Sequence, residues 1–150
     1  MAQSHSSILV HLVFSTKERA PFLIPDIRTE LFRYLSGILV GESATPHAIG
    51  GVADHVHLLL TLPRTKTIAT LAEALKTSSS KWLKTKGNEF RPFSWQHGYG
   101  AFSVSHSQLS SVSNYIRSQE RHHSQFDFKH EMRVLLSRHD IAFDEDYLWN

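Results

Sequence analysis

The amino-acid sequence predicts an α+β fold: one antiparallel sheet with helices on one face, followed by extra C-terminal helices. Two observations support this prediction. Strand-length apolar segments alternate with segments of helical periodicity, and the second and third strands are joined by so short a turn that they form an antiparallel hairpin. The resulting order of strand, helix, strand, strand, helix, strand is the split βαβ arrangement of a ferredoxin-like sandwich.

The first half of the chain supplies three strands and one helix. Residues 6–15 form a strand whose two faces are both largely apolar, which is typical of a strand inside a sheet. Residues 25 to about 40 form a helix, because leucine and isoleucine recur there at helical spacing after a proline. Residues 47–52 and 55–62 are the two strands of the hairpin, and a proline ends the second one.

The second half completes the sheet and adds helices beyond it. Residues 67 to about 86 form the second helix, with an apolar side and a basic, serine-rich side. Residues 95–105 form the last strand, which is rich in glycine where it starts. A third helix is predicted at 109–122 and a final one at about 129–138. No repeat or second domain is evident, so we expect residues 1–150 to form a single domain.

Composition restricts the class of protein. The 150 residues are 41% hydrophobic and 20% charged, as in globular domains. The net charge of +2 and the pI of about 9.0 permit nucleic-acid binding without requiring it. The sequence starts without a recognisable signal peptide, and its apolar runs are of strand length, so we expect a cytoplasmic protein with no membrane partner. Because the sequence contains no cysteine, any metal ion is held by nitrogen and oxygen ligands.

The central candidate site is a pair of histidines at the start of the third predicted strand. Side chains alternate along a strand, so His55 and His57 point to one face, whereas Val56 points to the other face, into a core. Two imidazoles on one face make half of a metal site. Asp54 would face away from such a site, which favours a role in the turn. His11 is either a structural histidine, the favoured interpretation, or lines the same surface of the sheet.

The third predicted helix offers a second pair of polar side chains. Tyr115 and Gln119 are four residues apart, so they lie on one side of the helix. Together with the two histidines, the amide oxygen of Gln119 would hold a divalent cation. This set of ligands suits Mg²⁺ or Mn²⁺, although the imidazoles would also accept Zn²⁺. The Tyr115 oxygen would then attack the phosphorus of a phosphodiester that the cation polarises.

Five basic side chains are candidates for contact with a nucleic-acid backbone. Lys17 and Arg19 follow the first strand, and Lys76, Lys81 and Lys84 lie on the polar side of the second helix. Charged helix faces are also common as ordinary solvated surface, and the sequence leaves both interpretations open.

Several segments, taken in their order along the chain, resemble the HUH-superfamily single-tyrosine transposases of small bacterial insertion sequences, which are relatives of the REP-associated tyrosine transposases. The segments are residues 11–17, 50–59, 95–104, 115–119 and the tail 143–148.

The resemblance implies a role for each candidate residue. His55 and His57 would be the metal-binding pair, with Gln119 as the third ligand. Tyr115 would be the nucleophile that forms a 5′-phosphotyrosine and frees a 3′-hydroxyl. The implied substrate is single-stranded DNA with imperfect hairpins at the ends of the element. The implied assembly is a homodimer, in which the tyrosine helix of one subunit often serves the histidines of the other.

Three other functions agree less well with the sequence. A relaxase is disfavoured, because relaxases generally place the tyrosine before the histidine pair, whereas Tyr115 follows it. A rolling-circle replication initiator shares the order found here, but the short chain shows no helicase-like extension. A non-catalytic nucleic-acid-binding regulator on the same fold would have no need of the complete set of candidate catalytic residues.

Overall fold

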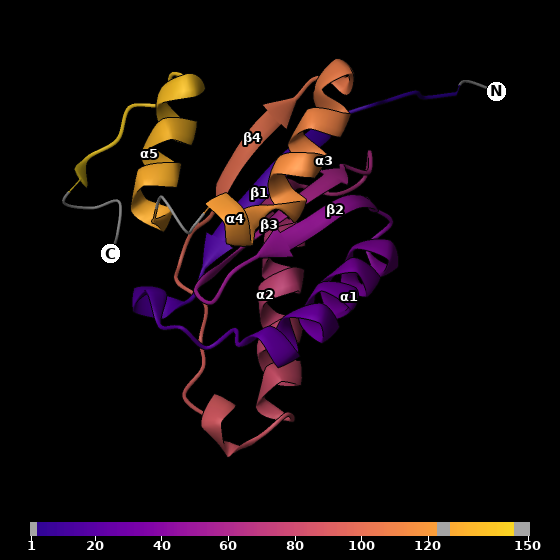
Figure 1. Ribbon diagram of the computed structural model, residues 1–150. Coiled ribbons are helices and arrows are strands. Elements are labelled where there is room, and N and C mark those ends of the chain that lie inside the picture. Colours follow the sequence, from indigo (N-terminus) through magenta and orange to yellow (C-terminus); the bar gives the residue numbers. More distant parts are fainter. Residues whose placement is uncertain (1–2, 123–126, 146–150) are drawn as a thin grey trace.

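The computed structural model describes residues 3–122 and 127–145, which include four strands in one sheet (Figure 1). The strands are β1 (Leu9–Ser15), β2 (Thr45–Gly51), β3 (His55–Thr61) and β4 (Gly100–Val104). Their order across the sheet is β2-β3-β1-β4, and every neighbouring pair is antiparallel. This topology confirms the predicted ferredoxin-like α+β class. Residues 146–148 of the predicted tail lie outside the described part of the chain.

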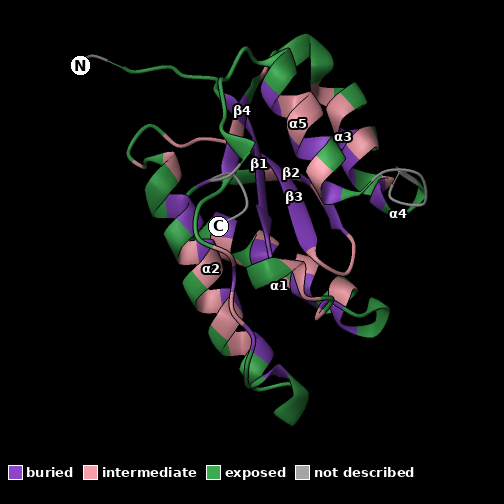
Figure 2. Cartoon of the chain, turned by 90° about the vertical axis from the view of Figure 1, so that its left-hand side faces the viewer, coloured by how far each residue is buried: buried purple, intermediate pink, exposed green. Residues whose placement is uncertain are grey.

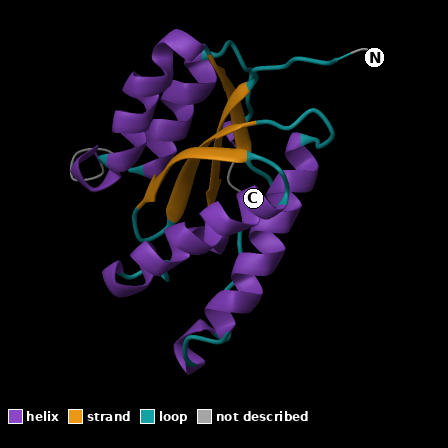
Figure 3. Ribbon diagram, turned by 90° about the vertical axis from the view of Figure 1, so that its right-hand side faces the viewer, coloured by secondary structure: helices purple, strands orange, loops and turns teal. Residues whose placement is uncertain are grey.

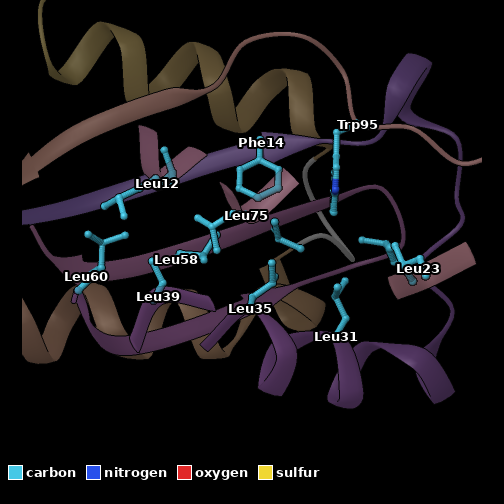
Figure 4. Close-up of a cluster of buried hydrophobic side chains, with 14 of the residues drawn as sticks. Leu12, Phe14, Leu23, Leu31, Leu35, Leu39, Leu58, Leu60, Leu75 and Trp95 are labelled. Atoms are coloured by element: carbon cyan, nitrogen blue, oxygen red, sulfur yellow. The ribbon is translucent and has the colours of Figure 1, made fainter. Parts of the chain in front are cut away.

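Two long helices cover one face of the sheet (Figure 3). They are α1 (Pro25–Gly41) and α2 (Ile68–Lys84). The alternate side chains of β1 and β3 that face them form the main core, together with leucines from both helices (Figure 4). The residues of β3 on this side are Val56, Leu58 and Leu60, as the alternation predicts. Burial of such apolar side chains is the main favourable contribution to folding.

The C-terminal helices cover the opposite face, where the histidines lie. They are α3 (Leu109–Arg117), the short α4 (Gln119–His122) and α5 (Phe128–Arg138). One small cluster joins Ile116 of α3 to β1, β2 and β3, and another joins apolar residues of α5 to β1 and β4. The strands are therefore buried on both faces, whereas the outer sides of the helices are exposed (Figure 2). Side chains on the histidine face are consequently held in a largely dry environment.

Three short 3₁₀ helices occur in the connections: η1 (Lys17–Arg19), η2 (Asn88–Phe90) and η3 (His106–Gln108). The last strand is shorter than the sequence predicts, because it starts at Gly100 instead of Trp95. Trp95 makes an isolated bridge with Thr16. Its ring packs on Phe14 in the main core, and its Nε1 donates to Ser79 Oγ at 2.9 Å. Trp95 is therefore a core residue.

The predicted helix at 109–122 is interrupted at Ser118, and this part of the prediction is wrong. Ser118 has φ −105° and ψ 28°, which ends α3, and α4 begins at the next residue. The hydroxyl of Ser118 donates to the carbonyl of Asn114 at 2.6 Å, which competes with continued helical bonding. Tyr115 and Gln119 therefore lie on two different helical segments.

None of the helices in the described part of the chain is both long enough and apolar enough to cross a membrane.

Candidate active site

His55 and His57 lie side by side on β3 and are fully buried. Their ring centroids are 5.2 Å apart, and the Nε2 atoms of both rings face the same carboxylate oxygen. That oxygen is Oε1 of Glu131, at 3.2 Å from His55 and 2.8 Å from His57. The side chains thus share one face of the sheet, as the alternation of the strand predicts.

Glu131 is the member of the site that the sequence analysis missed. It lies on α5, is 7% exposed, and reaches the histidines from above the sheet. The ligand atoms of His55, His57 and Glu131 all lie within 4.8 Å of one another, so the three residues could hold a metal ion. The sequence did contain a signal, because Glu131 stands between Phe128 and Met132 on the buried stripe of its helix. An unpaired carboxylate is costly in such a position.

Asp54 lies in the turn, as predicted, and also supports His55, the role that the sequence disfavoured. Its Oδ1 lies 2.7 Å from Nδ1 of His55. Burial by itself lowers the pKa of His55, but the contacts with Asp54 and Glu131 outweigh burial and raise it. A carboxylate on Nδ1 fixes the ring and leaves Nε2 as the atom that faces the site, as is common for metal-binding histidines.

His11 performs the corresponding role for His57. It is 4% exposed, and its Nε2 lies 2.7 Å from Nδ1 of His57. Burial, followed by the nearby His57, lowers the pKa of His11 to about 3, so its ring is neutral at pH 7. A neutral imidazole can either donate or accept through Nε2, depending on its tautomer. His11 therefore holds the His57 ring in place. It lies on the same surface of the sheet as the candidate site, which the sequence analysis considered less favoured than a purely structural role.

Tyr115 extends from α3 into the same cluster. Its hydroxyl donates to Oε2 of Glu131, the carboxylate that faces the histidines through its other oxygen. Its ring meets the His57 ring edge to face, at a centroid distance of 5.8 Å. Burial, with the charge of Glu131 and the hydrogen bond to it, raises the pKa of Tyr115 above its ordinary value. The candidate nucleophile and the candidate metal ligands of one chain are thus brought together.

Gln119 lies beside Tyr115 although the helix between them is broken. It is 1% exposed, and its Nε2 donates to the Tyr115 carbonyl at 3.2 Å. Within the described part of the chain, its Oε1 has no hydrogen-bond partner. A buried amide oxygen without a donor is costly unless a ligand satisfies it. This atom, two imidazoles and a carboxylate are suitable ligands for a hard divalent cation.

Three contacts connect the segment that carries Tyr115 to the rest of its own chain. A Cβ atom placed on Gly50 of β2 would lie 2.0 Å from the carbonyl oxygen of Ile116, so glycine allows α3 to approach the sheet closely. Arg117 donates to the carbonyl of His47 at 2.8 Å, and Arg28 of α1 donates to Glu120 of α4 at 2.8 Å. These contacts hold α3 and α4 against the sheet and α1 of the same chain.

The five basic candidates lie in two different places. Lys17 and Arg19 form part of η1, which follows β1 at the end of the sheet where Ser15 pairs with His55. Lys76, Lys81 and Lys84 lie on α2, across the sheet from the histidines. Lys76 donates to the carbonyls of Gln96 and Gly98 at 2.8 and 2.5 Å, so it tethers a loop.

Fold and site together define an α+β protein in which a sheet supplies paired histidines and a separate helix supplies a tyrosine. The sequence pattern of the family described as "Transposase IS200 like" matches residues 4–119. The chain belongs to this family, and hence to a class of DNA-processing enzymes. No curated protein matches the chain.

Solved structures show the same fold. A candidate transposase from Deinococcus radiodurans R1 is 23% identical with a TM-score of 0.62, and the match covers 77% of this chain and 95% of that one. A REP-associated tyrosine transposase bound to a REP hairpin is 13% identical with a TM-score of 0.54, over 77% of this chain and 70% of that one. At these sequence identities, both similarities show a shared fold and nothing further.

Proposed function

We propose that the protein cleaves and rejoins single-stranded DNA at the ends of an insertion sequence, through attack of Tyr115 on a phosphodiester. One observation carries this proposal: the Tyr115 hydroxyl and the Nε2 atoms of His55 and His57 meet around the carboxylate of Glu131. A regulator that only binds nucleic acid has no need of a half-buried tyrosine whose hydroxyl meets the carboxylate beside paired imidazoles. The DNA hairpin on a structural neighbour supports hairpin-ended DNA as the substrate.

A divalent cation fits this site, and we propose Mg²⁺ or Mn²⁺. His55, His57 and the orphaned Oε1 of Gln119 would hold it, with Glu131 as a further ligand that the sequence did not reveal. When bound, such an ion polarises a phosphate oxygen and stabilises the charge that develops there. Asp54 and His11 hold the two imidazoles in position through contacts with their Nδ1 atoms.

The chain's own residues account for the covalent step. Tyr115 must lose its proton to attack, and the group that accepts its hydrogen bond is the Glu131 carboxylate. The tyrosine oxygen forms a bond to phosphorus, the bond from phosphorus to the 3′-oxygen breaks, and the freed 3′-oxygen takes up a proton. The product is a 5′-phosphotyrosine with a free 3′-hydroxyl. Attack by a 3′-hydroxyl on this intermediate reverses the steps and rejoins the strand.

The remaining expectations belong to the same proposal. Residues 1–150 act as one domain in the cytoplasm, and two copies form a homodimer that brings two DNA ends together. The contacts of Tyr115 within its own chain favour a site assembled in cis, with one complete site in each subunit. Of the five basic candidates from the sequence, Lys17 and Arg19 are the best placed to contact DNA near the histidines.

A covalent adduct assay tests the proposal. The protein is incubated with labelled single-stranded DNA that carries the hairpin ends of its own element, in Mg²⁺ or Mn²⁺, and resolved under denaturing conditions. We expect a protein–DNA adduct that Tyr115→Phe abolishes and His57→Ala weakens. Tyr34→Phe is a matched control, since Tyr34 stacks on Trp82 on the opposite side of the sheet. Metal-independent binding with no adduct would instead support the non-catalytic regulator.

A further inference from the structure

A groove of about 660 Å³ lies between α3 and α5, above β4, and reaches the site at one end. Figure 1 shows the two helices standing on either side of this strand. Tyr115 and Glu131 belong to the lining, so the groove opens directly onto the candidate nucleophile. The buried ring of Phe102 from β4 lies on the floor, and the apolar side chains of Val112 from α3 and Leu135 from α5 lie on the walls.

The rim of the groove is polar and carries positive charge. Its exposed residues include Ser105, Gln108 and Ser111 on one side and Arg138 on the other. Among the described residues that line the groove, Glu131 is the only acid. The exposed His139 ring contacts Phe102 at a centroid distance of 4.8 Å. An apolar lining with a polar rim suits nucleobases, which have apolar faces and hydrogen-bonding edges.

Arg138 is well placed to bind a phosphate near the tyrosine. No carboxylate pairs with it in the described part of the chain. Its charge reaches Tyr115, where it opposes the larger effects of burial and of Glu131 that raise the pKa of that tyrosine. A guanidinium group binds phosphate oxygens through two parallel hydrogen bonds. The groove thus combines apolar side chains that can contact a nucleobase with a guanidinium group that can bind a phosphate.

One wall of the groove lies beyond the part of the chain that the family pattern covers. The pattern matches residues 4–119, whereas α5 spans Phe128–Arg138. The contribution of α5 to the groove therefore lies outside the region that the family shares.

We propose that this groove binds a nucleotide of single-stranded DNA next to the phosphodiester that Tyr115 attacks, with the base between the half-buried side chains of Val112 and Leu135 and a phosphate against Arg138. The inference rests on the proposed function and adds a substrate subsite to it. The basic face of α2 lies on the other side of the sheet and does not line this groove.

Binding without chemistry provides the first test. Fluorescein-labelled dT12 is titrated with the Tyr115→Phe protein in EDTA, and anisotropy is recorded at several salt concentrations. We expect Arg138→Ala to weaken binding about tenfold and to reduce the salt slope by about one. Arg133→Ala is the matched control on the same helix, because Arg133 pairs with Glu145 and does not line the groove. Equal affinities for the two variants would overturn the inference.

A crosslinking experiment locates the DNA independently of affinity. The dT12 probe carries 4-thiothymidine, and crosslinked peptides are identified by mass spectrometry. Crosslinks to α3 and α5 are the expected result, whereas crosslinks confined to α2 would contradict the proposal. Circular dichroism and melting curves of each variant separate a loss of binding from a loss of folding.

The adduct assay and these tests can fail separately. If no adduct forms with the element's hairpin DNA but Arg138→Ala still weakens dT12 binding, the proposed reaction is wrong and the subsite remains. If the adduct forms and Arg138→Ala changes neither binding nor adduct yield, the subsite is wrong and the reaction remains.

Discussion

The Nε2 atom of His11 on β1 lies 2.7 Å from Nδ1 of His57 on β3, in the buried layer between the sheet and the C-terminal helices. Because Nδ1 of His57 is engaged in this way, Nε2 is the atom left to face Glu131 and a metal ion. A histidine that resembled an ordinary core residue therefore determines how a candidate ligand is presented.

Removal of the His11 contact is expected to weaken metal binding. Leucine at position 11 has no polar atom for Nδ1 of His57, whereas glutamine can donate or accept at about the same place. We expect His11→Leu to reduce Mn²⁺ affinity about 10–100-fold and His11→Gln to retain most of it. Calorimetric titration measures the affinities. Imidazole ¹⁵N shifts of the metal-free proteins show whether the His57 tautomer changes, and an unchanged tautomer and affinity in His11→Leu would contradict the assigned role.

The depressed pKa of His11 predicts a loss of stability in acid. In the folded protein the pKa is about 3, against 6.5 for the ordinary side chain, so the unfolded chain binds the additional proton. This contribution to stability is fully present above pH 6.5 and declines as the pH falls toward 3, by up to about 1.4 kcal/mol per pH unit.

The measurement is the free energy of unfolding in urea at several pH values, for the wild type and for His11→Gln. The variant should show the shallower decline between pH 6 and 4. The raised pKa of His55 acts in the opposite sense, because its contribution is present below its unfolded pKa and is lost as the pH rises. Comparison of the two proteins removes most of that effect. Parallel stability curves would rule out His11 as the source.

Neutralisation of Glu131 is expected to lower the pKa of Tyr115. The charge of Glu131 and its hydrogen bond with the hydroxyl both raise this pKa, in addition to burial. In Glu131→Gln the tyrosinate should therefore form at a lower pH, while Mn²⁺ binding weakens because a carboxylate is lost. Absorbance at 295 nm follows the titration, and the same change in a Tyr115→Phe background identifies the group. A rise in pKa, or no change, would show that Glu131 does not act on the tyrosine.

The close approach of α3 to β2 is expected to make Gly50 intolerant of a side chain. In Gly50→Ala the added Cβ would lie 2.0 Å from the backbone oxygen of Ile116, so the helix that carries Tyr115 must move. We expect a loss of stability of about 1–3 kcal/mol and reduced adduct formation. Gly37→Ala in α1 is the control, because its Cβ meets nothing within 4 Å. Helix propensity predicts a gain of about 1 kcal/mol there. Chemical denaturation of both variants measures the difference, and equal stabilities would refute the packing argument.

Much of the fold was predictable because local patterns reflect it directly. Alternation along residues 55–62 predicts which side chains share a face, since successive side chains on a strand point in opposite directions. The short turn before His55 predicts an antiparallel hairpin, and the order of elements then leaves few topologies. The element boundaries were less accurate: β4 begins at Gly100, and the tyrosine helix ends at Arg117, where a serine hydroxyl bonds back to the helix.

The sequence by itself determined the ferredoxin-like fold, the shared face of His55 and His57, and the candidate roles of Tyr115 and Gln119. Only the tertiary structure decided that Glu131 joins them, that His11 holds His57, and that a groove beside Tyr115 is walled by α5. The reason is that the residues in these contacts lie far apart in the sequence. The contact from His11 spans 46 residues and that from Glu131 spans 74, and no local pattern records which distant side chains a packed core brings within hydrogen-bonding distance.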